Sequence, residues 1–217
     1  MHERYSSSRT LNADAGEHAI SSHPGEQAAA EAATRLSWRE FPYYAKRYGE
    51  RGWRFSLSDS GWIETLCELS FDAAKAQILW LANLLAARGM PRYLLERHLD
   101  HLHAELLAAV PDRGSRYEVL RDVAIHLRSI RIASVPESTF AQVGQELEAR
   151  TASCTERVKN MGSVIAAAVA DDQAGVGNVL GSVVTWAKDP ARFDSVWIEA
   201  VDAAVARTRA GSASVRK

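Results

Sequence analysis

Apolar side chains recur at intervals of three and four residues over most of the chain, which is the spacing of one face of an α-helix. The clearest example is the stripe formed by Phe71, Ala74, Ile78, Leu81 and Leu85. Trp80 and Leu84 widen this stripe, so we expect the helix to be deeply buried. We find no convincing alternation of apolar and polar residues, and therefore predict no strand.

Breakers and capping residues divide the periodic region into separate helices. Gly89-Met90-Pro91 is the clearest joint, because glycine suits the left-handed residue after a helix and proline suits the first position of the next. Gly49 and Gly52 are expected to break the segment between Pro42 and the next helix. The predicted helices cover residues 26–41, 58–69, 71–88, 91–110, 115–132, 137–150, 152–172, 179–188 and 190–209. We therefore predict an all-α, multi-helix bundle of roughly seven to nine helices.

The two ends of the chain lack this periodicity. Residues 1–25 are polar and rich in Ser, His, Glu and Ala, so we expect a flexible polar N-terminal tail. Residues 211–217 are expected to form a flexible tail for the same reason. A single helical domain is expected over residues 26–210, because 217 residues with 47% hydrophobic and 24% charged side chains suit one ordinary globular domain.

The overall charge argues against large anionic partners. The 26 basic residues nearly balance the 27 acidic residues, which leaves no broad field to attract a nucleic acid or an anionic membrane. No apolar run approaches the roughly 18 residues of a membrane span, and residues 1–27 contain no apolar core of a secretory signal. We therefore expect a cytoplasmic protein. Cys67 and Cys154 form no Cys-x-x-Cys pair, so we expect plain buried thiols.

A cluster of histidines lies in the segment LLERHLDHLHAELL, residues 94–107. On a helix, His98, His101 and Glu105 share one flank of the stripe Leu95, Leu99, Leu102 and Leu106, because they are three and four positions apart. The following helix adds His126 near its own apolar side. Two imidazoles, a carboxylate and His126 could hold Zn²⁺ or Fe²⁺.

Two observations favour a simpler interpretation of these histidines. The chain has no Glu-x-x-His motif, which argues against a carboxylate-bridged di-iron site. Histidines at the border of an apolar stripe commonly form hydrogen bonds or ion pairs with nearby acids, and His101 with Glu105 would form such a pair. We therefore favour a solvated helix flank over a metal site.

Two other segments have alternative interpretations. The segment AGVGNVLGS, residues 174–182, has its third glycine misplaced for a nucleotide-binding fingerprint and no following lysine, so a joint between helices is favoured over a phosphate loop. The segment RYGERGWRFSL, residues 47–57, interleaves basic and aromatic residues, as an anionic-ligand site can. Glu50 and the balanced net charge favour aromatic side chains that pack into the bundle.

One stretch resembles a known family. The segment WLANLLAARGMPRYLLERHLDHL, residues 80–102, resembles the corner between two central helices in globin-coupled oxygen sensors through Arg88-Gly89-Met90-Pro91 and Tyr93. In that family the haem-ligating histidine precedes the glycine by four, and Leu85 occupies that position here. The resemblance therefore implies a haemless, globin-like sensor domain that relays signals to partners. The same stretch is also similar to the helical cap that precedes cobalamin-binding domains.

We find no set of residues in the sequence that would form a catalytic site with a nucleophile, a base and an orienting acid. We therefore predict a non-enzymatic helical regulatory, sensor or adaptor module that acts through contacts with a protein partner or as a homodimer. Six tryptophans and the wide apolar helix face could supply the interface. The alternative is a metal- or cofactor-binding helical protein, which could be an enzyme, with His98, His101, Glu105 and His126 as ligands.

Overall fold

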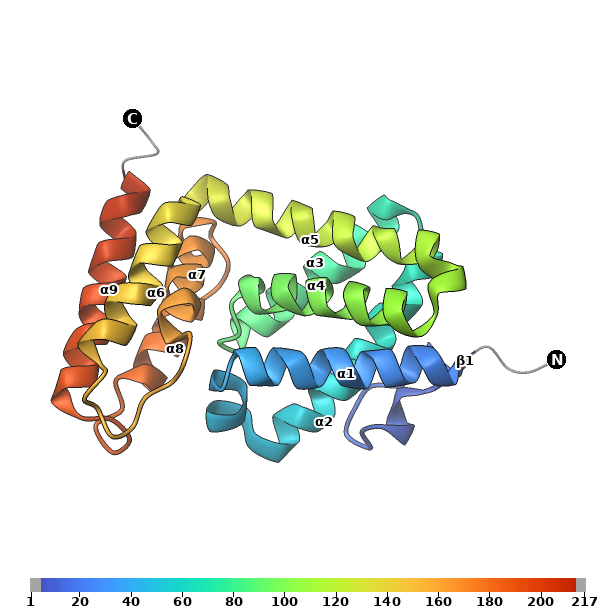
Figure 1. The fold of residues 1–217 in the computed structure, drawn as a ribbon, viewed down its shortest axis with the longest axis horizontal. Coiled ribbons are helices and arrows are strands. Elements are labelled where there is room, and N and C mark those ends of the chain that lie inside the picture. The colour runs from blue at the N-terminus through green and yellow to red at the C-terminus, as the bar shows by residue number, and fades with distance from the viewer. Residues whose placement is uncertain (1–4, 214–217) are drawn as a thin grey trace. The chain divides into compact units, whose positions relative to one another are not determined.

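The structure, a computed structural model, describes residues 5–213. These residues form nine α-helices, three short 3-10 turns and one pair of three-residue strands, which confirms the all-α, multi-helix class (Figure 1). The helices are α1 (Pro24–Glu40), α2 (Tyr43–Thr65), α3 (Phe71–Ala87), α4 (Arg92–Ala109), α5 (Gly114–Ser134), α6 (Glu137–Arg150), α7 (Met161–Gln173), α8 (Val179–Ala187) and α9 (Ser195–Ala213). The globin-like arrangement implied by the resemblance stays a prediction. No helix in residues 5–213 combines the length and the apolar character that a bilayer crossing requires.

Contacts within the chain concentrate in two compact units. The first comprises Met1–Leu79 with Glu96–Ile125, and the second comprises Trp80–Leu95 with His126–Lys217. The single domain expected over residues 26–210 therefore stays a prediction.

An N-terminal hairpin occupies part of the segment where sequence patterning predicted a polar tail. Strand β1 (Tyr5–Ser7) pairs antiparallel with β2 (Ala19–Ser21), and the 3-10 turn η1 (Ser8–Thr10) follows β1. The hairpin packs on α2, where Ile20 is only 1% exposed. It lies so close to Gly61 that a Cβ there would come within 3.1 Å of the Ile20 side chain. The hairpin has too few apolar side chains to produce a periodic pattern in the sequence. Residues 1–4 of the expected tail lie outside the described residues.

Helix α2 is longer than the pattern predicted. It begins directly after Pro42, and the expected break is reduced to a kink at Gly49, whose φ of 54° and ψ of −154° are non-helical. Gly52 stays within the helix although glycine has a low helix propensity, because packing outweighs that preference. Trp53 lies edge-on against Trp38 of α1, with ring centroids 5.2 Å apart. The aromatic residues of this segment thus join α1 to α2.

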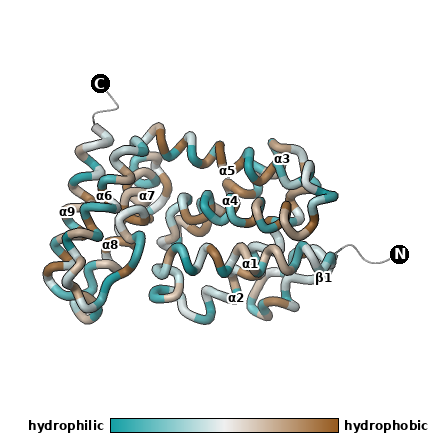
Figure 2. The backbone as a smooth tube through the Cα atoms, viewed as in Figure 1, coloured by the Kyte–Doolittle hydropathy of each residue, from teal (hydrophilic) through white to brown (hydrophobic). Residues whose placement is uncertain are grey.

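The leucine stripe of α4 is confirmed. Leu95 is 5% exposed, and Leu99, Leu102 and Leu106 are fully buried. Figure 2 shows the same alternation along α4 and α5, where hydrophobic segments are separated by hydrophilic ones. The periodicity of three and four residues therefore identified the buried side of α4.

The turn between α3 and α4 has the geometry predicted from Gly89 and Pro91. Gly89 has a left-handed φ of 85°, and the Met90 N–H donates to the carbonyl of Leu85 at 3.0 Å. Asp171 of α7 then accepts hydrogen bonds from the backbone N–H of Arg92, at 2.8 Å, and from its Nε, at 2.7 Å. Since Asp171 is 4% exposed, this buried carboxylate caps α4 and anchors it to α7.

In the second unit, α7 packs against α6, α8 and α9. Gly162 permits a close approach of α7 to α6, because a Cβ there would lie 2.7 Å from the Cα of Gly144 in α6. The glycine-bearing segment between α7 and α8 is a joint between helices, as predicted, with Gly175 and Gly177 at φ values of 73° and 54°.

Two helix starts in this unit were predicted too early. The helix expected from residue 152 begins at Met161, after Asn160 takes a left-handed φ of 60°. The last helix begins at Ser195 rather than Pro190. Its N-terminus is capped by Asp194, whose Oδ1 accepts the Trp197 N–H at 2.8 Å. An Asp-Pro pair such as Asp189-Pro190 is found both at the start of a helix and at the start of a turn, so the sequence pattern alone could not distinguish a helix from a turn there.

Candidate functional site

His98 is buried rather than on a solvated flank. It is 8% exposed, and its two ring nitrogens lie 3.0 Å from the Ser37 Oγ of α1 and 3.1 Å from the Ser60 Oγ of α2. Burial lowers the pKa of His98 to about 4. The side chain is therefore a neutral imidazole with both nitrogens engaged by hydroxyl groups, which is a structural role within the first unit.

His101 has a partner on another helix. Its Nε2 lies 2.6 Å from Glu40 Oε2 of α1, so the pairing with Glu105 expected from the helical spacing is not what the structure shows. Burial alone would raise the pKa of Glu40, but hydrogen bonds from His101 and Arg97 outweigh it and lower that pKa. These contacts link α4 to α1.

The four predicted metal ligands have separate surroundings. Glu105 and His126 are half-buried, and His126 belongs to the second unit while the other three belong to the first. Over residues 5–213, no group of three or more His, Cys, Asp or Glu side chains is placed to hold a metal ion. Zinc or iron binding by these residues stays a prediction.

A buried pair of carboxylates, absent from the sequence-based candidates, lies under the hairpin. Glu26 in the first turn of α1 accepts hydrogen bonds from the Ser21 hydroxyl at 2.5 Å, the Arg113 guanidinium at 2.8 Å and the Tyr117 hydroxyl at 2.8 Å. Glu64, near the end of α2, interacts electrostatically with Glu26 and with the backbone of Ser21. Both glutamates are buried, with exposures of 4% for Glu26 and 6% for Glu64.

The two carboxyl groups have opposite protonation preferences. Burial, together with the negative charge of Glu26, raises the pKa of Glu64 to about 8. Burial also acts to raise the pKa of Glu26, but hydrogen bonds from Ser21, Tyr117 and Arg113 outweigh it and lower that pKa to about 2. At neutral pH the pair therefore holds one proton, on Glu64, and one negative charge, on Glu26.

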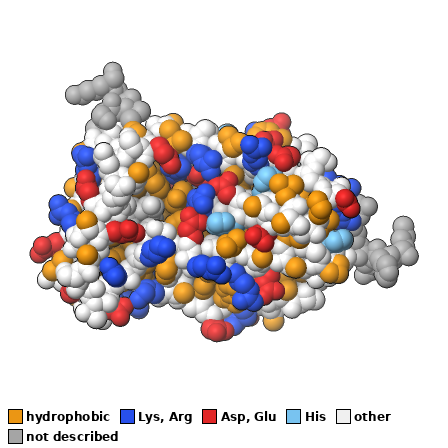
Figure 3. All heavy atoms as spheres, viewed as in Figure 1, with side chains coloured by type: hydrophobic (Ala, Val, Ile, Leu, Met, Phe, Trp, Pro, Cys, Tyr) orange, Lys and Arg blue, Asp and Glu red, His pale blue; other side chains and the backbone are white. Residues whose placement is uncertain are grey.

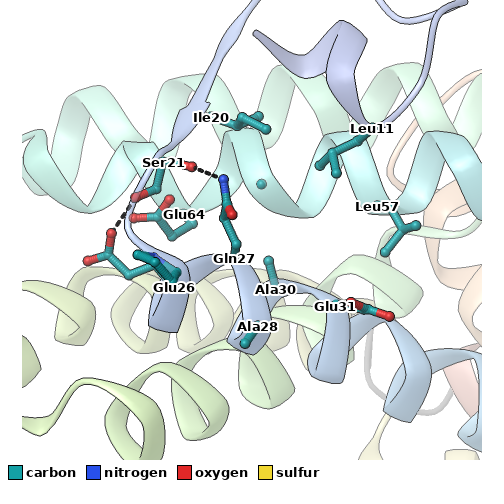
Figure 4. A pocket seen from close by; sticks show the side chains of 12 residues that line it. Leu11, Ile20, Ser21, Glu26, Gln27, Ala28, Ala30, Glu31, Leu57 and Glu64 are labelled. Atoms are coloured by element: carbon teal, nitrogen blue, oxygen red, sulfur yellow. Dashed lines mark hydrogen bonds between the residues drawn. The ribbon is translucent and has the colours of Figure 1, made fainter. Parts of the chain in front are cut away.

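A cavity of about 380 Å³ adjoins this pair, between the hairpin, α1 and α2 (Figure 4). Its lining residues are Leu11, Ile20, Ser21, Pro24, Glu26, Gln27, Ala28, Ala30, Glu31, Leu57, Gly61 and Glu64. Ile20, Ala30 and Glu64 are buried, whereas Gln27 and Glu31 are exposed, so the cavity has a buried floor and an open mouth. Sequence reasoning could have noticed Glu64, a carboxylate set between the apolar neighbours Ile63 and Leu66.

The outward side of α3 differs from the prediction made from the sequence. We expected Trp80 to be deeply buried, yet it is 59% exposed. The buried side of α3 is formed by Ala74, Ile78 and Leu81, and Trp80 projects on the opposite side. The outward positions, exposed except for the half-buried Leu84, are Ala73, Ala76, Gln77, Trp80, Asn83, Leu84 and Ala87. We call these seven residues the α3 face.

The cysteines offer no reactive thiol. Cys67 and Cys154 are both unbonded and buried, as predicted. Burial, reinforced by the negative charge of Glu26, raises the pKa of Cys67, so its thiol stays protonated at neutral pH.

Charged side chains of both signs are interspersed on the side of the molecule drawn in Figure 3, where no large field of one sign gathers. The carboxylate cavity and the α3 face are thus the two local features with distinctive chemistry. Comparison with family models, with curated proteins and with solved structures gave no match for this chain.

Proposed function

We propose that this chain is a non-enzymatic helical regulatory, sensor or adaptor module that acts through protein contacts and pairs with a second copy of itself through the α3 face. The observation that carries the proposal is the 59% exposure of Trp80 on a helix with no charged residue from 76 to 87. A large aromatic side chain exposed on an uncharged helix face is typical of a surface that contacts a partner.

The size of the exposed indole supports an interface. A tryptophan side chain has up to ~250 Å² of surface, so 59% exposure leaves roughly 150 Å² in water. Covering that area contributes up to ~4 kcal/mol at ~25 cal/mol per Å². Tryptophan is also among the residues that most often dominate binding energy when they lie at the centre of an interface.

The order of residues on the α3 face suits a second copy. Trp80 lies near the middle of α3, and the exposed positions are spaced symmetrically on either side of it. If two α3 helices pack antiparallel about a two-fold axis at Trp80, small residues leave room for the indoles, two amides can hydrogen-bond, and no like charges meet. The pairs that would meet are Ala73 with Ala87, Ala76 with Leu84, and Gln77 with Asn83.

The family resemblance agrees with this proposal. Residues 80–102, which resemble haemless globin-coupled-sensor domains, start at Trp80, and domains of that class relay signals to partners. Contact through one helix of 17 residues, about 25 Å long, lies at the small end of specific interfaces. We therefore expect a reversible dimer, with a dissociation constant in the range of ~1 μM.

Sedimentation velocity over a concentration series tests the proposal. The wild-type chain should shift from the mass of one chain to twice that mass as its concentration rises. Trp80→Asp should stay monomeric, because it puts two like charges at the two-fold axis. Val196→Asp in α9 is the matched control, since Val196 is 47% exposed and lies outside the α3 face, and it should dimerise like the wild type.

Circular dichroism of Trp80→Asp should match that of the wild type, which would show that the helices are intact. A wild-type chain that remains monomeric at several hundred micromolar would refute the homodimer. So would a Trp80→Asp variant that dimerises as well as Val196→Asp.

A further inference from the structure

We propose that the cavity between the hairpin, α1 and α2 is a binding site for a small organic ammonium ion, with the carboxyl group of Glu64 as its counter-charge. The cavity's volume of about 380 Å³ falls in the range of small-molecule sites, which is roughly 300–1,000 Å³. A mostly apolar wall with a few polar groups is the usual composition of such a site.

The charges of the lining determine the class of ligand. Three carboxyl groups, those of Glu26, Glu31 and Glu64, line the cavity, and among the described residues no Lys, Arg or His does. An anionic ligand would meet only like charges there, whereas a cation would be attracted. At the mouth, Glu31 forms an exposed ion pair with Arg35, so its charge is partly offset by a base outside the cavity.

The buried floor singles out Glu64 as the counter-charge. The charge of Glu26 is already offset by Arg113 of the 3-10 turn η3 (Pro111–Arg113) and stabilised by hydrogen bonds from Ser21 and Tyr117. Glu64 interacts with Glu26 and with the backbone of Ser21; Arg113 also lowers the pKa of Glu64, but its guanidinium is hydrogen-bonded to Glu26. When Glu64 ionises, a ligand cation would supply a positive charge that pairs with it directly.

The apolar lining accounts for the rest of the ligand. Leu11 and Ile20 of the hairpin segment and Leu57 of α2 border the cavity, and Figure 4 shows their side chains around the space next to Gln27. Gly61 has no side chain, which keeps the floor open beside Ile20. A compact cyclic or branched hydrocarbon body attached to the ammonium group would cover these side chains.

Binding should release a proton. Glu64 is protonated at neutral pH, because burial and the adjacent charge of Glu26 hold its pKa at about 8, with Arg113, Tyr117 and Cys67 as the other titratable neighbours. When R–NH₃⁺ enters, the carboxyl proton leaves to solvent and an ammonium–carboxylate pair remains. The net charge of the site is unchanged and no covalent bond is made, so one cation replaces one proton.

Isothermal titration calorimetry with cyclohexylammonium chloride at pH 7 tests this proposal, with cyclohexanol as the neutral probe of the same shape. Repeating the titration in phosphate and in MOPS, which differ in ionisation enthalpy and carry no net positive charge, counts the protons released. We expect release of about one proton, and a dissociation constant for cyclohexanol at least ~10-fold higher, equivalent to ~1.4 kcal/mol. Glu64→Gln should weaken cyclohexylammonium binding by a factor of ~10 or more and abolish the proton release.

Two further variants make the result interpretable. Glu31→Gln is the matched control at the mouth and should change affinity by no more than ~3-fold, because exposed charges interact weakly. Ala28→Trp keeps the carboxyl pair and adds a bulky ring at an exposed lining position, so it should block binding even if Glu64→Gln folds poorly. Absence of binding to the wild type at millimolar cyclohexylammonium, equal affinity for cyclohexanol, or full affinity in Ala28→Trp would overturn the proposal. None of these outcomes depends on dimerisation through the α3 face.

Discussion

The carboxylate pair leads to an unusual dependence of stability on pH. The folded-state pKa of Glu64, about 8, is raised above its ordinary value of 4.5. Between these two values the unfolded chain has lost the Glu64 proton while the folded chain retains it. The stabilisation from protonated Glu64 is therefore complete below pH 4.5 and is lost as the pH rises toward 8.

The loss caused by Glu64 falls in the window from pH 6.5 to pH 8, where only the tail of the opposing His98 titration in the unfolded chain remains. His98, with a folded-state pKa of about 4, is already neutral in the folded chain, and Glu26, with a pKa of about 2, is fully ionised. One proton difference changes the free energy of unfolding by ~1.4 kcal/mol per pH unit. Because folded Glu64 begins to ionise near pH 8 and His98 of the unfolded chain loses its remaining proton near pH 6.5, the wild-type chain should lose about 1 kcal/mol of stability over this window.

Glu64→Gln should remove this loss. Glutamine is neutral at every pH in the window and keeps a hydrogen-bond donor and an acceptor, so it resembles the protonated acid. Urea unfolding, followed by tryptophan fluorescence at four pH values from 6.5 to 8, measures the slope. Glu31→Gln serves as the control and should keep the wild-type slope. The reasoning is refuted if wild-type stability stays constant or rises across the window, or if Glu64→Gln declines as steeply as the wild type.

Three further predictions concern other buried contacts. We compare the single variant Glu64→Gln with the double variant Glu64→Gln, His98→Gln. Lowering the pH from 6.5 to 4 should reduce the free energy of unfolding by ~3 kcal/mol more in the single variant, because its buried imidazole resists the protonation that the unfolded chain accepts. Equal losses in the two variants would contradict the burial of His98. Gly162→Ala should lower stability by ~2 kcal/mol or more in thermal unfolding, since its Cβ would lie 2.7 Å from the backbone of Gly144, and an unchanged melting temperature would show that α6 and α7 are farther apart. Asp171→Asn should cost ~3 kcal/mol in urea unfolding, because it leaves the Arg92 guanidinium, whose side chain is only 12% exposed, without its counter-charge. A loss below ~1 kcal/mol would mean that the pair is solvated.

Prediction from sequence succeeded where the determining interactions are local. The stripe of α4, the joint at Gly89 and Pro91, and the turn at Gly175 all depend on residues within a few positions of one another. Where the same local signal has two structural uses, the prediction failed. Gly49 produced a kink instead of a helix end, and the Asp189-Pro190 pair began a turn instead of a helix.

The candidate sites were harder to predict because their partners are distant in the chain. The spacing of His98, His101 and Glu105 suggested one shared environment. In the structure, His98 lies between two serines of α1 and α2, and His101 binds Glu40 of α1. Helical spacing states which side chains share a face, but it does not state which groups from other helices lie against that face.

The sequence by itself determined that this chain is helical, where most of its helices run, and which sides of them are apolar, because a period of 3.6 residues is a property of the local backbone. Only the tertiary structure decided that Glu26 and Glu64 meet beneath the hairpin and that Trp80 remains in water. Burial of a particular side chain depends on how the helices pack against one another. That packing depends on many contacts between segments that are distant in the chain, and the local pattern of apolar residues does not specify these contacts.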